Sequence, residues 1–133
     1  MRRALIVGIN DYLSAPLQGC VNDANAIASV LETHGTGSPN FQVRLMTSPS
    51  DDVTRANLRE AIEKLFATDC DIALLYFSGH GFLRSADGYI VTKDATKYDE
   101  GIGMTELLKL ANASPVKNKV IILDCCFSGN MGT

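Results

Sequence analysis

The chain has 133 residues, of which 46% are hydrophobic and 20% charged, and this composition is typical of one globular domain. Its formal charge of −3 and its scattered lysine and arginine residues form no basic stripe, which argues against nucleic acid or an anionic membrane as partner. No apolar segment approaches the length of a membrane-spanning helix. We therefore expect a cytoplasmic protein whose four cysteines remain thiols.

The chain begins with a pattern of strand, helix and strand. The apolar run at residues 4–9 predicts a strand buried on both faces, and the alternating residues 41–45 predict a strand near a sheet edge. Gly35 is placed to end the helix between them, and His34 would then lie in its last turn. The residues at helical spacing are Cys20, Ala24, Ile27 and Leu31.

A second helix and a third strand follow. Thr54 is suited to cap the helix, and Val53 is placed to pack on Leu58. The apolar stripe of this helix consists of Leu58, Ala61, Ile62, Leu65 and Phe66. The apolar run at residues 72–77 predicts another strand buried on both faces.

A polar insertion at residues 81–103 interrupts the alternation. Residues 82–84 and 89–91 flank an Asp-Gly pair at 87–88, which predicts a small β-hairpin. Pro115 ends a third helix, whose apolar side chains are Met104, Leu107, Leu108 and Ala111. The run at residues 120–123 then predicts a last strand buried on both faces.

This order predicts the α/β fold class. Parallel strands require crossovers, and each crossover helix must bury an apolar stripe against the sheet. We therefore expect a three-layer sandwich, with a mainly parallel sheet, helices on both faces and the hairpin as an insertion. Residues 1–133 would form a single domain.

Two strand ends carry the residues that suggest chemistry. In open parallel sheets, ligands bind beyond the carboxyl ends of the strands. The third strand leads into Ser-Gly-His-Gly, which contains His80 and Gly81, and the last strand leads into Asp124, Cys125 and Cys126. An imidazole beside a thiol is the minimum set for cysteine catalysis, and glycines around His80 allow unusual backbone angles and a close substrate approach.

These motifs resemble those of caspases, and of metacaspases in particular. The matching segments are residues 76–81, residues 124–129 and the Gly-Cys-Val-Asn-Asp-Ala segment at 19–24, and they span most of the chain in the family's order. The resemblance implies that Cys126 is the nucleophile and His80 the base of a cysteine endopeptidase. It also implies that Asp23 and Asp124 form an acidic pocket for arginine or lysine before the scissile bond. The candidate N–H donors to the oxyanion are Gly81 and Cys126.

Structural interpretations compete with these roles. Cys126 could be a buried thiol, His80 could be a loop histidine, and Asp124 could simply end its strand. Asp23 lies near the expected start of a helix, where carboxylates are favourable without any ligand. Adjacent strand residues face opposite sides, so only one of Cys125 and Cys126 is expected to reach the cleft, and the motif selects Cys126.

The resemblance also bears on cofactors and on other parts of the protein. No resident cofactor is expected; calcium activates some metacaspases, and Asp99-Glu100 is the nearest acidic match here. Caspase-like domains continue through a small subunit, so we expect this chain to be the large-subunit region of a self-processing protein. Its partners would be protein or peptide substrates and its own small-subunit segment.

Two other functions were considered. A caspase-like module without turnover could serve as an interaction or regulatory domain, although the intact His and Cys motifs count against this. A nucleotide hydrolase would need a phosphate-binding GxxxxGK[ST] loop after the first strand, and the sequence has none there.

Overall fold

A parallel sheet forms the centre of the molecule. The computed structural model describes residues 1–13 and 15–125. The strands are β1 (Arg2–Ile9), β2 (Gln42–Ser48), β3 (Ile72–Ser78) and β7 (Asn118–Asp124), in the order β2-β1-β3-β7. Every neighbouring pair is parallel, so all four carboxyl ends lie at one edge of the sheet.

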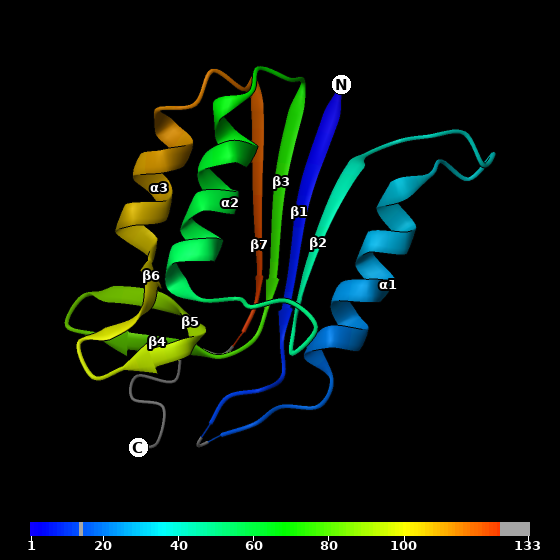
Figure 1. The fold of residues 1–133 in the computed structure, drawn as a ribbon. Helices are drawn as coiled ribbons and strands as arrows, with labels where there is room; N and C mark the ends of the chain where they lie inside the picture. Colours follow the sequence, from blue (N-terminus) through cyan, green and yellow to red (C-terminus); the bar gives the residue numbers. More distant parts are fainter. Residues whose placement is uncertain (14, 126–133) are drawn as a thin grey trace.

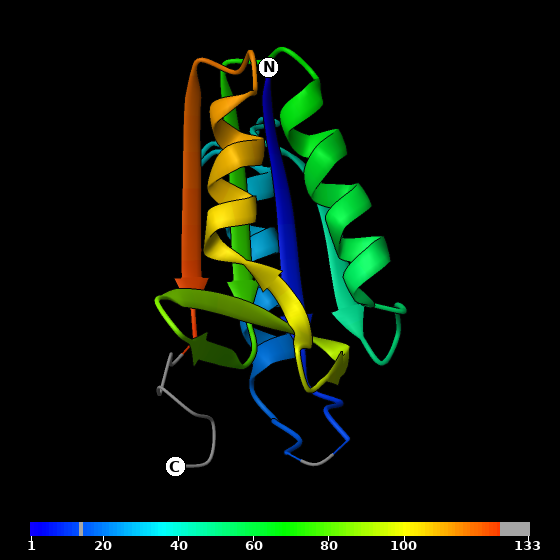
Figure 2. The same cartoon turned by 90° about the vertical axis from the view of Figure 1, so that its left-hand side faces the viewer.

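Helices cover both faces of this sheet. Helix α1 (Cys20–Glu32) lies on one face, and α2 (Arg55–Ala67) and α3 (Met104–Asn112) lie on the other (Figure 1). Figure 2 shows α2 and α3 side by side in front of the strands. This arrangement confirms the predicted α/β three-layer architecture. Among the described residues, no helix has the length and apolar character needed to cross a membrane.

The core consists of two clusters separated by the sheet. The larger one fills the space between the sheet and α2 and includes all five predicted apolar residues of that helix. The smaller cluster lies under α1, where Ala24 and Ala28 allow the helix to approach the sheet closely. At Gly8 this approach is so tight that a Cβ atom would lie 2.6 Å from the Cys20 carbonyl oxygen and 2.8 Å from the Ala24 Cβ.

The starts of the first two helices use different caps. As predicted, Thr54 caps α2, because its hydroxyl accepts a hydrogen bond from the Asn57 N–H at 3.2 Å. Helix α1 is capped from a distance: the Asn10 side-chain oxygen accepts hydrogen bonds from the N–H groups of Cys20 (3.0 Å) and Val21 (3.3 Å). A residue at the end of β1 therefore fixes where α1 begins.

The predicted end of α1 was wrong. The helix stops at Glu32, and the residue that takes a left-handed conformation is Gly37, with a φ of 89°, instead of Gly35. His34 lies in the turn beyond the helix, where its N–H donates to the Ser38 carbonyl at 2.7 Å. The pairing of Thr33 with Pro39 in an isolated bridge accounts for this earlier end.

The insertion is a three-stranded antiparallel sheet and not only a hairpin. Its strands are β4 (Gly81–Arg84), β5 (Asp87–Thr96) and β6 (Asp99–Gly103). Arg84 pairs with Asp87, so the turn consists of residues 85 and 86, and the Asp-Gly pair predicted to form it lies inside β5. Pairing with Leu83 and Arg84 of β4 draws these two residues into the sheet, and the unpredicted strand β6 pairs with β5 further along, from Tyr89 onward.

The burial predicted for both faces of β7 and for Leu108 of α3 was also wrong. Strand β7 is an edge strand, and its side chains Val120 and Ile122 are 38% and 45% exposed, because α1 packs on β1, β2 and β3. In α3, Leu108 is 50% exposed, and Leu110 packs on the core instead.

The close contact at Gly8 generates a test of the packing. We expect Gly8→Ala to lower the free energy of unfolding by about 1 to 3 kcal/mol, because the new methyl group must push α1 away from β1. Gly35→Ala is a matched control, since a Cβ there meets nothing within 4 Å. Urea denaturation of both variants measures the difference, and equal stabilities would contradict the close packing.

Candidate active site

The candidate residues lie where two neighbouring strands end. Strand β3 leads directly into His80, and β7 ends at Asp124. Ser78 and Asp124 are register partners in adjacent parallel strands, so the first residue of the second motif lies beside the first motif. Cys126 belongs to the second motif and lies outside the described residues.

The imidazole of His80 is held in one orientation. Its Nε2 atom lies 2.6 Å from the carbonyl oxygen of Ala15. A carbonyl oxygen only accepts hydrogen bonds, so Nε2 must carry a hydrogen, and in the neutral ring Nδ1 is then the basic nitrogen. The imidazole also packs on the ring of Tyr12, with 4.4 Å between the ring centroids.

Tyr12 fixes the backbone of His80 as well as its side chain. The His80 N–H donates to the Tyr12 hydroxyl at 3.0 Å, and this hydroxyl donates to the Val91 carbonyl at 2.8 Å. The Val91 N–H in turn donates to the His80 carbonyl at 3.0 Å. The Tyr12 hydroxyl therefore lies between the His80 N–H and the Val91 carbonyl, in the place of one direct hydrogen bond of the ladder that joins His80 to β5. Burial raises the pKa of Tyr12 well above its usual range, so the phenol remains a donor.

The two glycines beside His80 have different structural roles. At Gly79 a Cβ atom would collide with the Tyr12 hydroxyl and lie 2.8 Å from the Phe77 ring, and the backbone is not left-handed there. Close approach therefore requires this glycine, and the backbone freedom predicted for it is not used. Gly81 pairs with Ile90 next to the hydrogen-bonded pair of His80 and Val91. Because such pairs alternate, the Gly81 N–H is directed away from β5.

The two predicted pocket carboxylates lie near the same phenol. The Tyr76 hydroxyl donates to Asp124 Oδ2 at 3.1 Å. Burial, this carboxylate and, as the smallest contribution, the charge of Asp23 together raise the pKa of Tyr76 to about 12. Helix α1 begins at Cys20, so Asp23 lies in its first turn and does not cap it. We call this group of Asp23, Tyr76 and Asp124 the acidic corner.

The cysteines of the described residues have packing contacts. Cys125 is partly buried against the main core cluster, and Cys70 is buried in that cluster. Cys20 is partly buried at the start of α1. The expectation that Cys126, and not Cys125, reaches the cleft stays a prediction, because Cys126 lies outside the described residues.

The acidic pair considered for calcium is bound by arginines. Arg84 lies 2.5 Å from Glu100 and holds the pKa of that carboxyl below its usual range. Asp99 lies 3.8 Å from Arg55. Within residues 1–13 and 15–125, no group of three or more metal-binding acidic, histidine or cysteine side chains is found.

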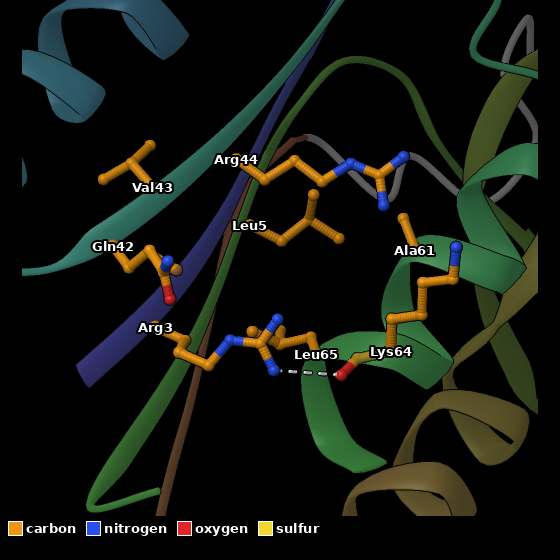
Figure 3. A pocket seen from close by; sticks show the side chains of 9 residues that line it. Arg3, Leu5, Gln42, Val43, Arg44, Ala61, Lys64 and Leu65 are labelled. Atoms are coloured by element: carbon orange, nitrogen blue, oxygen red, sulfur yellow. Dashed lines mark hydrogen bonds between the residues drawn. The ribbon is translucent and has the colours of Figure 1, made fainter. Parts of the chain in front are cut away.

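A separate cavity lies at the opposite end of the sheet. It has a volume of about 280 Å³ and lies between the first residues of β1 and β2 and the C-terminal half of α2 (Figure 3). Its polar lining includes Arg3, Arg44 and Lys64, and Arg3 donates to the Lys64 carbonyl. It contains none of the residues of the two motifs.

Comparison with known proteins identifies the family. The sequence matches the caspase domain along residues 1–133. This chain belongs to the caspase domain family. Family membership supports a function of the cysteine-peptidase type in general.

The fold is also similar to a solved structure, that of a protein from Geobacter sulfurreducens studied in a structural genomics programme. The TM-score is 0.74 at 24% identity, and the match covers 99% of this chain. The chain spans 53% of the length of that protein. No curated protein sequence gives a match.

Three parts of this caspase-family site were not found from the sequence. They are the hydroxyl of Tyr12, the carbonyl of Ala15 and the phenol of Tyr76 as a partner of Asp124. Tyr76 lies within the motif at residues 76–81, so the sequence marked this residue, but no sequence signal predicted its hydrogen bond with Asp124. Tyr12 and Ala15 lie in a loop far from His80 in sequence, where no local pattern signals such contacts.

The bridging hydroxyl generates a second prediction. We expect Tyr12→Phe to lower the free energy of unfolding by about 1 to 3 kcal/mol, because the His80 N–H and the Val91 carbonyl lose their shared partner. Tyr98→Phe is the control, since that side chain is exposed. Denaturation in guanidinium chloride measures both. A loss of equal size in the two variants would argue against the bridge.

The acidic corner generates a prediction about alkaline pH. The pKa of Tyr76 is about 12 in the folded protein and about 10 in an unfolded chain. The unfolded state loses its proton first, so the free energy of unfolding should fall as pH rises from about 10 to about 12. Tyr76→Phe removes this contribution, so its stability should fall less steeply over this range. Parallel curves for the two proteins, measured by urea denaturation at several pH values, would contradict the assignment.

Proposed function

We propose that this chain carries the catalytic residues of a metacaspase-type cysteine endopeptidase that cleaves after arginine or lysine. The observation that carries the proposal is the fixed imidazole of His80, whose Nε2 is bound to the Ala15 carbonyl. This leaves Nδ1 to exchange protons. Ser78 and Asp124 are register partners, and His80 and Cys126 each follow two positions later. The register therefore favours a pairing of this imidazole with the Cys126 thiol.

The proposed reaction uses only protein groups and water. His80 takes the proton of the Cys126 thiol, and the sulfur attacks the peptide carbonyl. The N–H groups of Gly81 and Cys126 stabilise the resulting oxyanion, and the outward direction of the Gly81 N–H supports this role. His80 then donates the proton to the leaving amine, which gives a thioester. Water hydrolyses the thioester with His80 as base, which restores the thiol.

The acidic corner supplies the proposed specificity. Asp23 and Asp124 would bind the arginine or lysine side chain before the scissile bond. Charge-assisted hydrogen bonds to a guanidinium or ammonium group are strong, and two carboxylates repel an acidic side chain. Tyr76 supports this proposal, because its hydroxyl binds Asp124 and its pKa is raised by burial first and then by the negative charges of Asp124 and Asp23.

A second proposal concerns the rest of the protein. Strand β7 is an edge strand with the exposed apolar side chains Val120 and Ile122. We propose that a following small-subunit segment of the same protein pairs with this edge and covers these side chains, and that self-processing separates the two parts. The 53% coverage of the Geobacter sulfurreducens protein is consistent with further structured residues. The protein would act on protein or peptide substrates and require no resident cofactor, with calcium as a possible activator.

The test is covalent labelling of the full-length protein by a peptide chloromethylketone ending in arginine. We expect the wild type and Cys125→Ala to be labelled and Cys126→Ala to remain unlabelled. A matched reagent ending in norleucine should react much more slowly, because it lacks the positive charge. Intact mass spectrometry, with and without calcium, gives the rates.

Two outcomes would contradict the proposal. Equal labelling of the Cys126→Ala variant would show that another group is the nucleophile. No labelling and no cleavage of any basic peptide under either calcium condition would favour an interaction module without turnover.

A further inference from the structure

A second cavity touches His80 on the side of the antiparallel sheet. Its volume is about 390 Å³, which is within the usual range of ligand pockets. It is lined by Tyr12, Leu13 and Ala15 from the loop after β1, by His80, by residues of β4 and β5, and by Lys97 and Glu100. The acidic corner contributes none of its described lining residues. The cavity is therefore a distinct space that shares the imidazole with the proposed catalytic centre.

The interior of this cavity is mainly apolar. Phe82, Val91 and Ala95 contribute apolar side chains that also pack on the main core cluster. Leu13 is fully exposed at its mouth. An apolar surface of this kind favours an apolar side chain over a charged one, because it offers no compensation for lost hydration.

The rim of the cavity carries positive charge. Arg84 is paired with Glu100, and Lys93 lies 2.6 Å from Asp52. The Lys97 Nζ atom lies 5.2 Å from the centroid of the Tyr98 ring, and Lys97 has no carboxylate partner among residues 1–13 and 15–125. An incoming lysine or arginine would meet this excess positive charge, so a basic side chain should be disfavoured.

The cavity and the acidic corner lie on opposite faces of the central sheet. Tyr76 belongs to the small core cluster under α1, whereas Val91 and Phe82 belong to the cluster on the other face of the sheet. A peptide with its basic side chain in the acidic corner must cross His80 at the scissile bond. Because His80 gives its proton to the leaving amine, the residues after that bond continue beyond the imidazole.

We propose that this cavity binds an apolar side chain at one of the first two positions after the scissile bond and disfavours lysine and arginine there. The inference rests on the proposed function, because it takes the acidic corner as the site for the basic residue. It makes the antiparallel sheet a specificity element: the enzyme would require a basic residue before the bond and a bulky apolar residue after it.

The test compares quenched fluorescent peptides that share an arginine before the scissile bond. The residues at the first and second positions after it are varied among phenylalanine, leucine, glycine and lysine. We expect kcat/KM of the full-length protein to be at least about tenfold higher with an apolar residue at the preferred position than with glycine. Lysine should be the poorest choice at that position.

Two variants of neighbouring residues locate the effect. Phe82→Ala should remove most of the preference for the apolar residue, because it opens the cavity wall. Leu83→Ala is the matched control: this residue is 38% exposed and is not part of the lining. Labelling by the arginine chloromethylketone involves no residue after the bond, so the labelling rate of each variant is the reference for its peptide rates, and it should be unchanged in Leu83→Ala.

The outcomes separate this inference from the proposed function. Normal labelling together with equal kcat/KM for all four residues at both positions would overturn the cavity proposal and leave the endopeptidase proposal standing. Equal loss of the preference in the Phe82→Ala and Leu83→Ala variants would also overturn it. Absence of labelling in the wild type would remove the basis of both proposals.

Discussion

The hydroxyl of Tyr12 joins the two sheets of the protein at the candidate catalytic histidine. It takes the place of one direct hydrogen bond between His80 and Val91 and satisfies both backbone groups. The same tyrosine packs its ring on the imidazole, and the loop that carries it also supplies the Ala15 carbonyl. One short loop after β1 therefore determines the backbone, the ring position and the Nε2 contact of His80.

The parallel register explains why residues distant in sequence can form a site. Strands β3 and β7 run in the same direction with Ser78 opposite Asp124, so the two strands end at the same level of the sheet. Helix α1 covers one face of the sheet and helices α2 and α3 cover the other, so the ends of the strands have different surroundings on the two faces. Under α1 lies the acidic corner, whereas the antiparallel sheet and the main core cluster provide an apolar surface on the other side. This asymmetry gives the two faces of the sheet different chemical character near the end of β3.

The sequence predicted the elements that are governed by local apolar patterns. The four parallel strands and the stripe of α2 are such cases, because a continuous apolar run or a helical repeat requires burial. Predictions failed where a partner distant in sequence decides the structure. Strand β6 forms by pairing with β5, and β7 is partly exposed because α1 lies over other strands. The Tyr12 bridge spans more than 60 residues, and no local pattern signals it.

The carboxylates of the protein differ in whether a positively charged side chain offsets their charge. Glu100, Glu106 and Asp52 are each paired with an arginine or lysine, which offsets their negative charge. Asp124 is instead held by the neutral phenol of Tyr76, which orients the carboxylate and leaves its charge uncompensated. Asp23 lies exposed in the first turn of α1 and adds a second negative charge. In the described part of the chain, neither aspartate has a cationic partner, so a basic side chain of a substrate would bring the first one.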